Sequence, residues 1–243
     1  MPLRAPFGGR IFRGWYITGF GAVALMLAGP YVFGIFLRPM TEELGWSRGD
    51  FALANTVSVF MGGVVGFFVG PIVDGRRGRW LIAGGAVLAG LSLMALAFVE
   101  EMWQFWVLRG VLFVVGSAGV SPLVVNSTIS KWFVRRRGTA IAIASMGLSS
   151  GAIVVAPFIA WVVVGWGWRT GWVVQGVLLI VVLAIPAVFI IRRQPEDLGL
   201  HPDGDTDADL AAQAARPAGR SGQRTAANEV SWTRAEAMRT RQL

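Results

Sequence analysis

Three polar side chains interrupt long apolar stretches of this chain. Placing each of them in apolar surroundings costs free energy unless it finds a polar partner. If the fourth span enters the bilayer near Trp103, Arg109 is the only charged residue well inside a span; Asn126 lies further along the same span, and Tyr31 lies in the first. A buried guanidinium attracts anions such as carboxylates, and hydroxyl and amide groups can line a cavity. These three residues are therefore the candidate substrate-binding or coupling residues.

The elements that must position them are six long uncharged stretches joined by short loops. Each has about the 20 apolar residues that a helix needs to cross roughly 30 Å of hydrocarbon. The pattern predicts an all-α protein that spans a lipid bilayer six times. The stretches are Gly14–Leu37, Phe51–Val73, Trp80–Val99, Gly110–Ser130, Gly138–Trp168 and Thr170–Ile191.

Composition supports this class of protein and excludes others. Hydrophobic residues make up 54% of the chain and charged residues 15%, below the roughly 25% charge of a soluble domain. With no cysteine and a single histidine, His201, the sequence predicts no metal site and no cofactor. No cluster of acids, histidines or activated nucleophiles indicates an enzyme. The positive charge lies in short loops beside apolar spans, which favours orientation in a bilayer over nucleic-acid binding.

The arginines also predict the topology. They are concentrated before the first span, after the second, after the fourth and after the sixth, while the alternate loops carry five of the six acids of residues 1–193. Short loops rich in Lys and Arg stay in the cytoplasm. The protein is therefore expected in the cell (inner) membrane as a multi-pass protein, with both termini cytoplasmic.

The three polar residues each have a structural alternative to a functional role. A lipid-facing arginine would cost at least ~2.5 kcal/mol, so Arg109 should face the helix bundle or a wet cavity. Alternatively, Arg109 extends to the outer interface and pairs with Glu100 or Glu101. Tyr31 and Asn126 either line a cavity or bond to a neighbouring helix.

Glycines at four-residue spacing predict close helix contacts. Gly62, Gly66 and Gly70 lie in the second span, and Gly147 and Gly151 lie in the fifth. Small residues at this spacing let helix backbones approach closely.

Loop motifs give the chain a family resemblance. Gly70-Pro-Ile-Val-Asp74-Gly-Arg76-Arg77-Gly78-Arg79 resembles the G-x-x-x-D-R-x-G-R-R signature of major facilitator superfamily transporters, with Gly75 where the family has a basic residue. Three further segments resemble the monocarboxylate-porter-like and oxalate/formate-antiporter-like branch. They are Gly29-Pro30-Tyr31, Ser130-Lys-Trp-Phe-Val-Arg135-Arg136-Arg137-Gly138, and Arg193-Gln-Pro-Glu-Asp-Leu-Gly199.

The resemblance implies a fold and a domain organisation. Residues 1–193 would form the N-terminal six-helix half of a transporter, built as two inverted three-helix repeats. Pro30 and Pro122 then occupy the corresponding first helices of the two repeats. Residues 194–243 would be a polar cytoplasmic tail resembling the loop between the two halves, and residues 201–228 are expected to be disordered.

The same resemblance implies a function and partners. The chain, or the protein whose N-terminal half it resembles, would move a small solute across the membrane by alternating access. An organic anion such as a monocarboxylate is favoured, on the resemblance and on Arg109. The loop 70–79, with Gly70, Asp74, Arg76, Arg77 and Arg79, would be a gating loop, and Arg135, Arg136, Arg137 and Gly138 would form a cytoplasmic loop after the fourth span. A second six-helix half or a homodimer partner would complete the cavity. The alternative is a truncated, non-transporting membrane protein or an assembly subunit.

Overall fold

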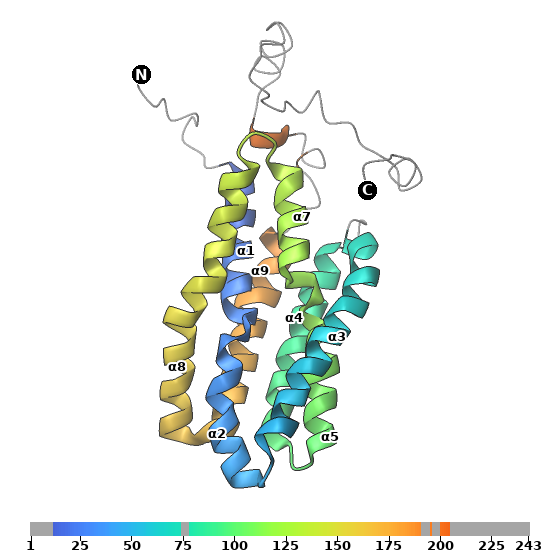
Figure 1. Ribbon diagram of the computed structural model, residues 1–243. Coiled ribbons are helices and arrows are strands. Elements are labelled where there is room, and N and C mark those ends of the chain that lie inside the picture. The colour runs from blue at the N-terminus through green and yellow to red at the C-terminus, as the bar shows by residue number, and fades with distance from the viewer. Residues whose placement is uncertain (1–11, 74–77, 191–194, 196–199, 205–243) are drawn as a thin grey trace, which may run out of the picture.

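A computed structural model describes residues 12–73, 78–190, 195 and 200–204, and no strand occurs in these ranges. The helices follow one another in six runs (Figure 1). The first run is α1 (Arg13–Ala28), η1 (Pro30–Val32) and α2 (Phe33–Leu44); the second is α3 (Arg48–Val73); the third is α4 (Gly78–Ala95) with η2 (Leu96–Phe98). The fourth is α5 (Met102–Phe105), the π-helix η3 (Trp106–Leu112), α6 (Phe113–Ser117), η4 (Ala118–Val120) and α7 (Pro122–Trp132). The fifth run is the part of α8 (Arg137–Leu179) before the interruption at Gly167. The sixth is the rest of α8 with the π-helix η5 (Ile180–Ala184) and α9 (Ile185–Ile190), and η7 (Pro202–Gly204) follows it.

The helical runs have the length and apolarity that a bilayer requires. Four segments of the described chain are long and apolar enough to cross a membrane, namely Arg13–Leu44, Arg48–Phe68, Met102–Trp132 and Arg137–Ile190. A fifth apolar helix, Ile82–Phe98, is shorter. The 54-residue segment reverses direction at Gly167, whose φ of 84° lies in the left-handed region that favours glycine. The protein is therefore an all-α membrane protein, as the sequence predicts.

Two sequence-predicted boundaries are wrong. The fourth run begins at Met102 and not at Gly110, so Arg109 lies about two turns inside it. The reversal between the last two runs falls on Gly167 and not on Arg169. Both errors arose because a charged side chain was taken to end a span, whereas the backbone continues through it.

Successive runs alternate in direction, so the first and last described residues meet at the same end of the bundle (Figure 1). A side chain at Gly204 would touch the ring of Phe12, at 3.0 Å. This agrees with an even number of passes.

Glycine contacts hold the helices together, although only some of the predicted ones do so. A Cβ at Gly147 would collide with the backbone of Ala22 in α1, and one at Gly151 with Tyr31 and the carbonyl of Met26. The prediction for the fifth span is therefore confirmed.

The prediction for the second span is wrong for Gly62 and Gly66, which have nothing within 4 Å because they border open space. The surroundings of Gly70 lie outside the described side chains. The close contacts that the sequence analysis missed join α4 to its neighbours. Gly85 packs on Gly116, and Gly90 packs on Gly176.

Aromatic and polar contacts fasten α2 to the part of α8 that follows Gly167. Phe36 stacks on Trp172 with ring centroids 3.7 Å apart, and Trp172 donates its indole N–H to the Met40 sulfur at 3.4 Å. Glu43 accepts a hydrogen bond of 2.7 Å from the Trp168 indole and pairs with Arg169. The end of the first run is thereby fixed to the start of the sixth.

The first and fourth runs are both broken before a proline. Gly29 has φ −65° and ψ 154°, and Ser121 has φ −65° and ψ 156°. A proline clashes with a helical residue before it, so both residues are extended and a new helix starts at Pro30 and at Pro122. The two prolines noted in the sequence thus make equivalent breaks in the two runs.

A pair of glycine substitutions tests the packing. Gly147→Ala should lower the free energy of unfolding by ~1–3 kcal/mol, because the added methyl meets the Ala22 backbone, which cannot move aside as a side chain can. Gly66→Ala, on the open face, should change it by less than ~1 kcal/mol in either direction. Thermal unfolding of the two purified variants in one detergent measures the difference, and equal losses would contradict the assigned helix contact.

Candidate functional site

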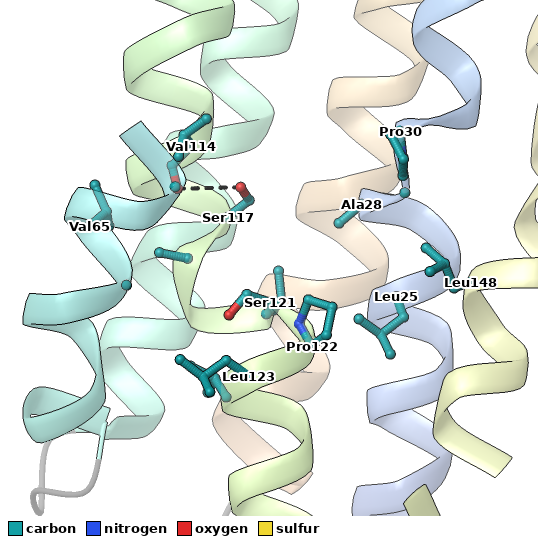
Figure 2. A pocket seen from close by; sticks show the side chains of 16 residues that line it. Leu25, Ala28, Pro30, Val65, Val114, Ser117, Ser121, Pro122, Leu123 and Leu148 are labelled. Carbon is teal, nitrogen blue, oxygen red and sulfur yellow. Dashed lines mark hydrogen bonds between the residues drawn. The ribbon is translucent and has the colours of Figure 1, made fainter. Parts of the chain in front are cut away.

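A pocket lies between the first, second, fourth and fifth runs (Figure 2). It has a volume of about 420 Å³, within the range of roughly 300–1,000 Å³ typical of small-molecule sites. Its wall is built from apolar side chains and glycines, and only Ser117 and Ser121 contribute polar side chains. The lining residues are Leu25, Ala28, Gly29, Pro30, Gly62, Val65, Gly66, Val114, Ser117, Ala118, Val120, Ser121, Pro122, Leu123, Val124 and Leu148.

Both helix breaks open onto this pocket. Gly29 and Pro30 line it from one side, and Ser121 and Pro122 line it from another (Figure 2). A helix start leaves its first backbone N–H groups without partners inside the helix, and a helix end does the same to its last carbonyls. In hydrocarbon, such irregular backbone is tolerated where it borders a cavity or other protein groups. The pocket is therefore the place where the bundle exposes backbone hydrogen-bonding groups.

Tyr31 and Asn126 are not pocket-lining residues. The Tyr31 hydroxyl lies against Gly151, and neither it nor the Asn126 side-chain oxygen has a hydrogen-bond partner, although both atoms are buried. The Tyr31 hydroxyl and the Asn126 side-chain oxygen therefore make no bond to a neighbouring helix, and the residues lie outside the wall of this pocket. Two unsatisfied polar atoms beside the two breaks remain unexplained by the packing of this chain alone.

Arg109 faces the interior of the bundle, as expected from the cost of placing it in lipid. Its side chain is 8% exposed, and its guanidinium lies 4.3 Å from the ring centroid of Phe113 and 5.2 Å from that of Phe33. Its hydrogen bond is a long one, 3.5 Å to the Ser58 hydroxyl. The alternative in which it extends to Glu100 or Glu101 is wrong, because within the described ranges no carboxylate pairs with it. It also lies outside the pocket lining.

Two serines that the sequence analysis overlooked support the backbone around Arg109. Arg109 lies in the π-helix η3, whose wider turn disrupts the regular hydrogen-bond ladder. Ser92 donates to the Leu108 carbonyl at 2.6 Å, and the Ser58 hydroxyl, which donates to the Ala54 carbonyl of its own helix at 2.7 Å, also lies 3.3 Å from the Arg109 carbonyl. A serine inside an apolar span was the available signal, but its partner could not be known before the helices were packed.

The sequence-predicted loop after the second run is only partly described. Gly70 lies in α3 and Arg79 lies in α4. Asp74, Arg76 and Arg77 lie outside the described residues.

The loop after the fourth run is held by a carboxylate from far along the chain. Asp203 accepts backbone N–H bonds from Val134 at 3.0 Å, Arg135 at 2.7 Å and Arg136 at 3.3 Å. Its side chain is 4% exposed, and the Arg135 Nε lies 3.8 Å from it. Since α8 begins at Arg137, this carboxylate lies at a helix N-terminus, where negative charge is favoured.

The remaining loop residues take different positions. Arg137 donates to the carbonyls of Phe133, at 3.3 Å, and Ser130, at 3.1 Å, and so caps the end of α7. Arg136 is exposed, and Gly138 has open space around it. The expectation of disorder from residue 201 onward is wrong for residues 201–204, because Asp203 fixes them to this loop.

Metal-binding chemistry finds no support where side chains are placed. In the described ranges no three histidine, cysteine or acidic side chains come together as a metal would require.

The fold and pocket define a polytopic membrane protein with a solute-sized hollow between interrupted helices. A sequence profile of the Major Facilitator Superfamily matches residues 19–241, and the chain belongs to this superfamily. Several of the relatives it matches are named as MFS-type transporters, and one is named as a membrane sensor protein.

Three relatives show how much of such a protein this chain represents. It is 31% identical to the MFS-type transporter pytF of Aspergillus terreus, over 78% of this chain and 64% of the relative. It is 27% identical to the uncharacterized MFS-type transporter YcxA of Bacillus subtilis, over 67% of this chain and 40% of the relative. It is 28% identical to the aspyridones efflux protein apdF of Emericella nidulans, over 79% and 41%. The chain therefore spans about two fifths to two thirds of these relatives.

Replacing Arg109 by methionine tests whether the buried charge lowers the stability of the folded protein. Arg109→Met keeps an unbranched side chain in the Phe33–Phe113 environment and removes a charge that has no carboxylate partner. We expect it to unfold at the same or a higher temperature than the parent, because replacing a buried charge by an apolar side chain is neutral or stabilising by ~1–4 kcal/mol. Arg169→Met, which breaks the pair with Glu43, is the control and should be slightly destabilising. A large loss of stability in Arg109→Met would indicate a structural role.

The Asp203 contact predicts a protease-sensitive turn. Asp203→Ala leaves three backbone N–H groups without their carboxylate acceptor, and because these groups are part-buried or exposed, water replaces it and the turn is held less firmly. Trypsin should then cleave the Arg135–Arg137 turn several-fold faster, as followed by mass spectrometry of the fragments. Glu42→Gln, which removes an exposed pair with Arg38, should leave this cleavage unchanged. Equal cleavage in all three proteins would contradict the proposed anchoring of the turn.

Proposed function

We propose that this chain forms the N-terminal half of a secondary active transporter that moves a small solute by alternating access. The observation that carries the proposal is the pocket, which lies between runs from both three-helix sets and is bordered by a break in the first helix of each. Interrupted helices of this kind are where transporters place their solute sites, and rocking of one half against the other exposes such a site to each side in turn.

The other wall of the solute path comes from a second six-helix half or from a second copy of this chain. Support lies on α3, where only 11% of the apolar window is buried and the Gly62–Gly66 face meets nothing. Lipid can cover apolar side chains, but glycines at four-residue spacing are suited to another helix backbone. The partner is therefore proposed to pack on α3.

The protein is proposed to lie in the cytoplasmic (inner) membrane with both termini in the cytoplasm. The arginines of the 135–138 turn and of the segment 70–79 then face inward, as short basic loops do. In this orientation Asp203 holds the 135–138 turn on the cytoplasmic side, where the two halves must separate and close. These two loops are the proposed gating elements.

A small organic anion, such as a monocarboxylate of the resembled branch, is the first candidate substrate. The observation that favours it is Arg109, a buried cation without a carboxylate partner among the described residues. Ionisable groups inside membranes are expensive and generally functional. A truncated, non-transporting protein or assembly subunit is the alternative to transport.

We expect transport activity only in oligomers whose mass corresponds to two six-helix units. The purified chain is separated by size in detergent, each fraction is assigned a mass by native mass spectrometry, and solute counterflow is assayed after reconstitution into liposomes. We expect no counterflow from the monomer, since it supplies one wall of the path, and saturable counterflow from fractions that contain two six-helix units.

The outcomes separate the alternatives. Transport by the monomer would contradict the need for a partner. Absence of transport from every fraction, including one that contains a second six-helix chain, would favour the non-transporting alternative.

A further inference from the structure

The pocket is chemically unlike a site for a small hydrophilic anion. None of its lining residues is charged, and its two hydroxyls belong to Ser117 and Ser121. The Ser117 hydroxyl already donates to the Val114 carbonyl at 3.4 Å. Arg109, the cation on which the organic-anion candidate depends, is enclosed by Phe33 and Phe113 instead of lining the pocket. An acetate-sized ion would exchange its hydration shell for an apolar wall, which is strongly unfavourable.

The size of the pocket points the same way. A hollow of about 420 Å³ holds a drug-sized molecule, and such sites combine a mostly apolar wall with a few polar groups that fix the orientation of the ligand. Here the apolar wall comes from four helices, with Leu25, Val65, Leu123 and Leu148 on different sides (Figure 2). The body of the ligand is therefore expected to be apolar.

The polar groups are supplied by the two breaks. Helices begin at Pro30 and at Pro122, so two helix starts meet the same pocket. The backbone N–H groups that follow each proline have no partner within their own helix. Ser121 has the extended backbone of an N-cap residue, but its hydroxyl makes no capping bond. The Ser121 hydroxyl can therefore donate to a carbonyl or carboxyl oxygen of a ligand in the pocket.

We infer that the pocket binds an amphipathic organic solute, with an apolar body against the four helices and a hydrogen-bond-accepting head at the Ser121 hydroxyl. This inference rests on the proposed transport function and names the substrate class of that same site. A neutral carbonyl and a carboxylate share the required chemistry, and the body separates both from short, hydrophilic acids.

Site-directed thiol labelling can test this inference directly, because the chain has no cysteine of its own. Val65→Cys places a thiol in the pocket wall, and Val59→Cys places one on the same helix at a position that is 70% exposed and outside the pocket. Each variant of the full chain is reconstituted in lipid nanodiscs and labelled with N-ethylmaleimide. The competing probes are octanoate, methyl octanoate and acetate, with Leu148→Cys as a second pocket position.

At ten times their dissociation constants, octanoate and methyl octanoate should slow labelling of Val65→Cys and Leu148→Cys about tenfold, since roughly a tenth of the pockets stay free. Labelling of Val59→Cys should not change, and acetate at the same concentrations should protect neither pocket position.

Three results would overturn the inference. They are protection by acetate equal to that by octanoate, equal protection at Val59 and Val65, and no protection at either pocket position. Failure of transport itself is measured separately, by the counterflow assay, so an empty pocket and an inactive carrier give different results.

Discussion

The constraint on which this structure depends is that backbone N–H and C=O groups in hydrocarbon must find partners within the protein. That constraint makes every described apolar run helical, and it makes each departure from the helix informative. The departures include extended residues at Gly29 and Ser121, and π-helical turns at Trp106–Leu112 and Ile180–Ala184. The two extended residues border the pocket, and the first π-helical turn carries Arg109.

The irregular segments differ in how their polar groups are satisfied. Around Arg109 the Ser92 hydroxyl of a neighbouring helix donates to one carbonyl and the Ser58 hydroxyl of another lies beside the next, so this region is closed by the chain itself. At the two breaks no comparable side chain is present, and the freed groups face a pocket. This contrast is why the pocket, and not the buried arginine, is the better candidate for a solute site, while Arg109 remains a candidate for coupling.

The packing also divides the surface of the bundle into closed and open faces. The contacts of Gly147, Gly151, Gly85 and Gly90 bring α1, α4 and α8 close to their neighbours, and these contacts leave no space for a side chain. The similarly spaced glycines of α3 are open beside the same pocket. A superfamily member that spans about two fifths to two thirds of its relatives is expected to have such a face, because a solute path needs a second wall.

The sequence by itself determined the solvent of this protein, the helical class and the family. Long uncharged stretches and basic loops indicate these properties residue by residue, because the free energy of placing each of these residues in hydrocarbon does not depend on its neighbours. It also marked Pro30 and Pro122, since a proline disfavours a helical residue before it in any context. Only the tertiary structure decided which residues meet. It shows that Gly147, and not Gly62, contacts another helix, and that Arg109 has no carboxylate partner among the described residues. It also shows that Asp203 binds a turn some 70 residues earlier, and that both helix breaks border one pocket. The physical reason is that contacts between helices depend on how each helix is rotated about its axis, on its depth in the membrane and on which helices are its neighbours. Apolar residues cover nearly every face of these helices, so the sequence pattern does not define these three quantities.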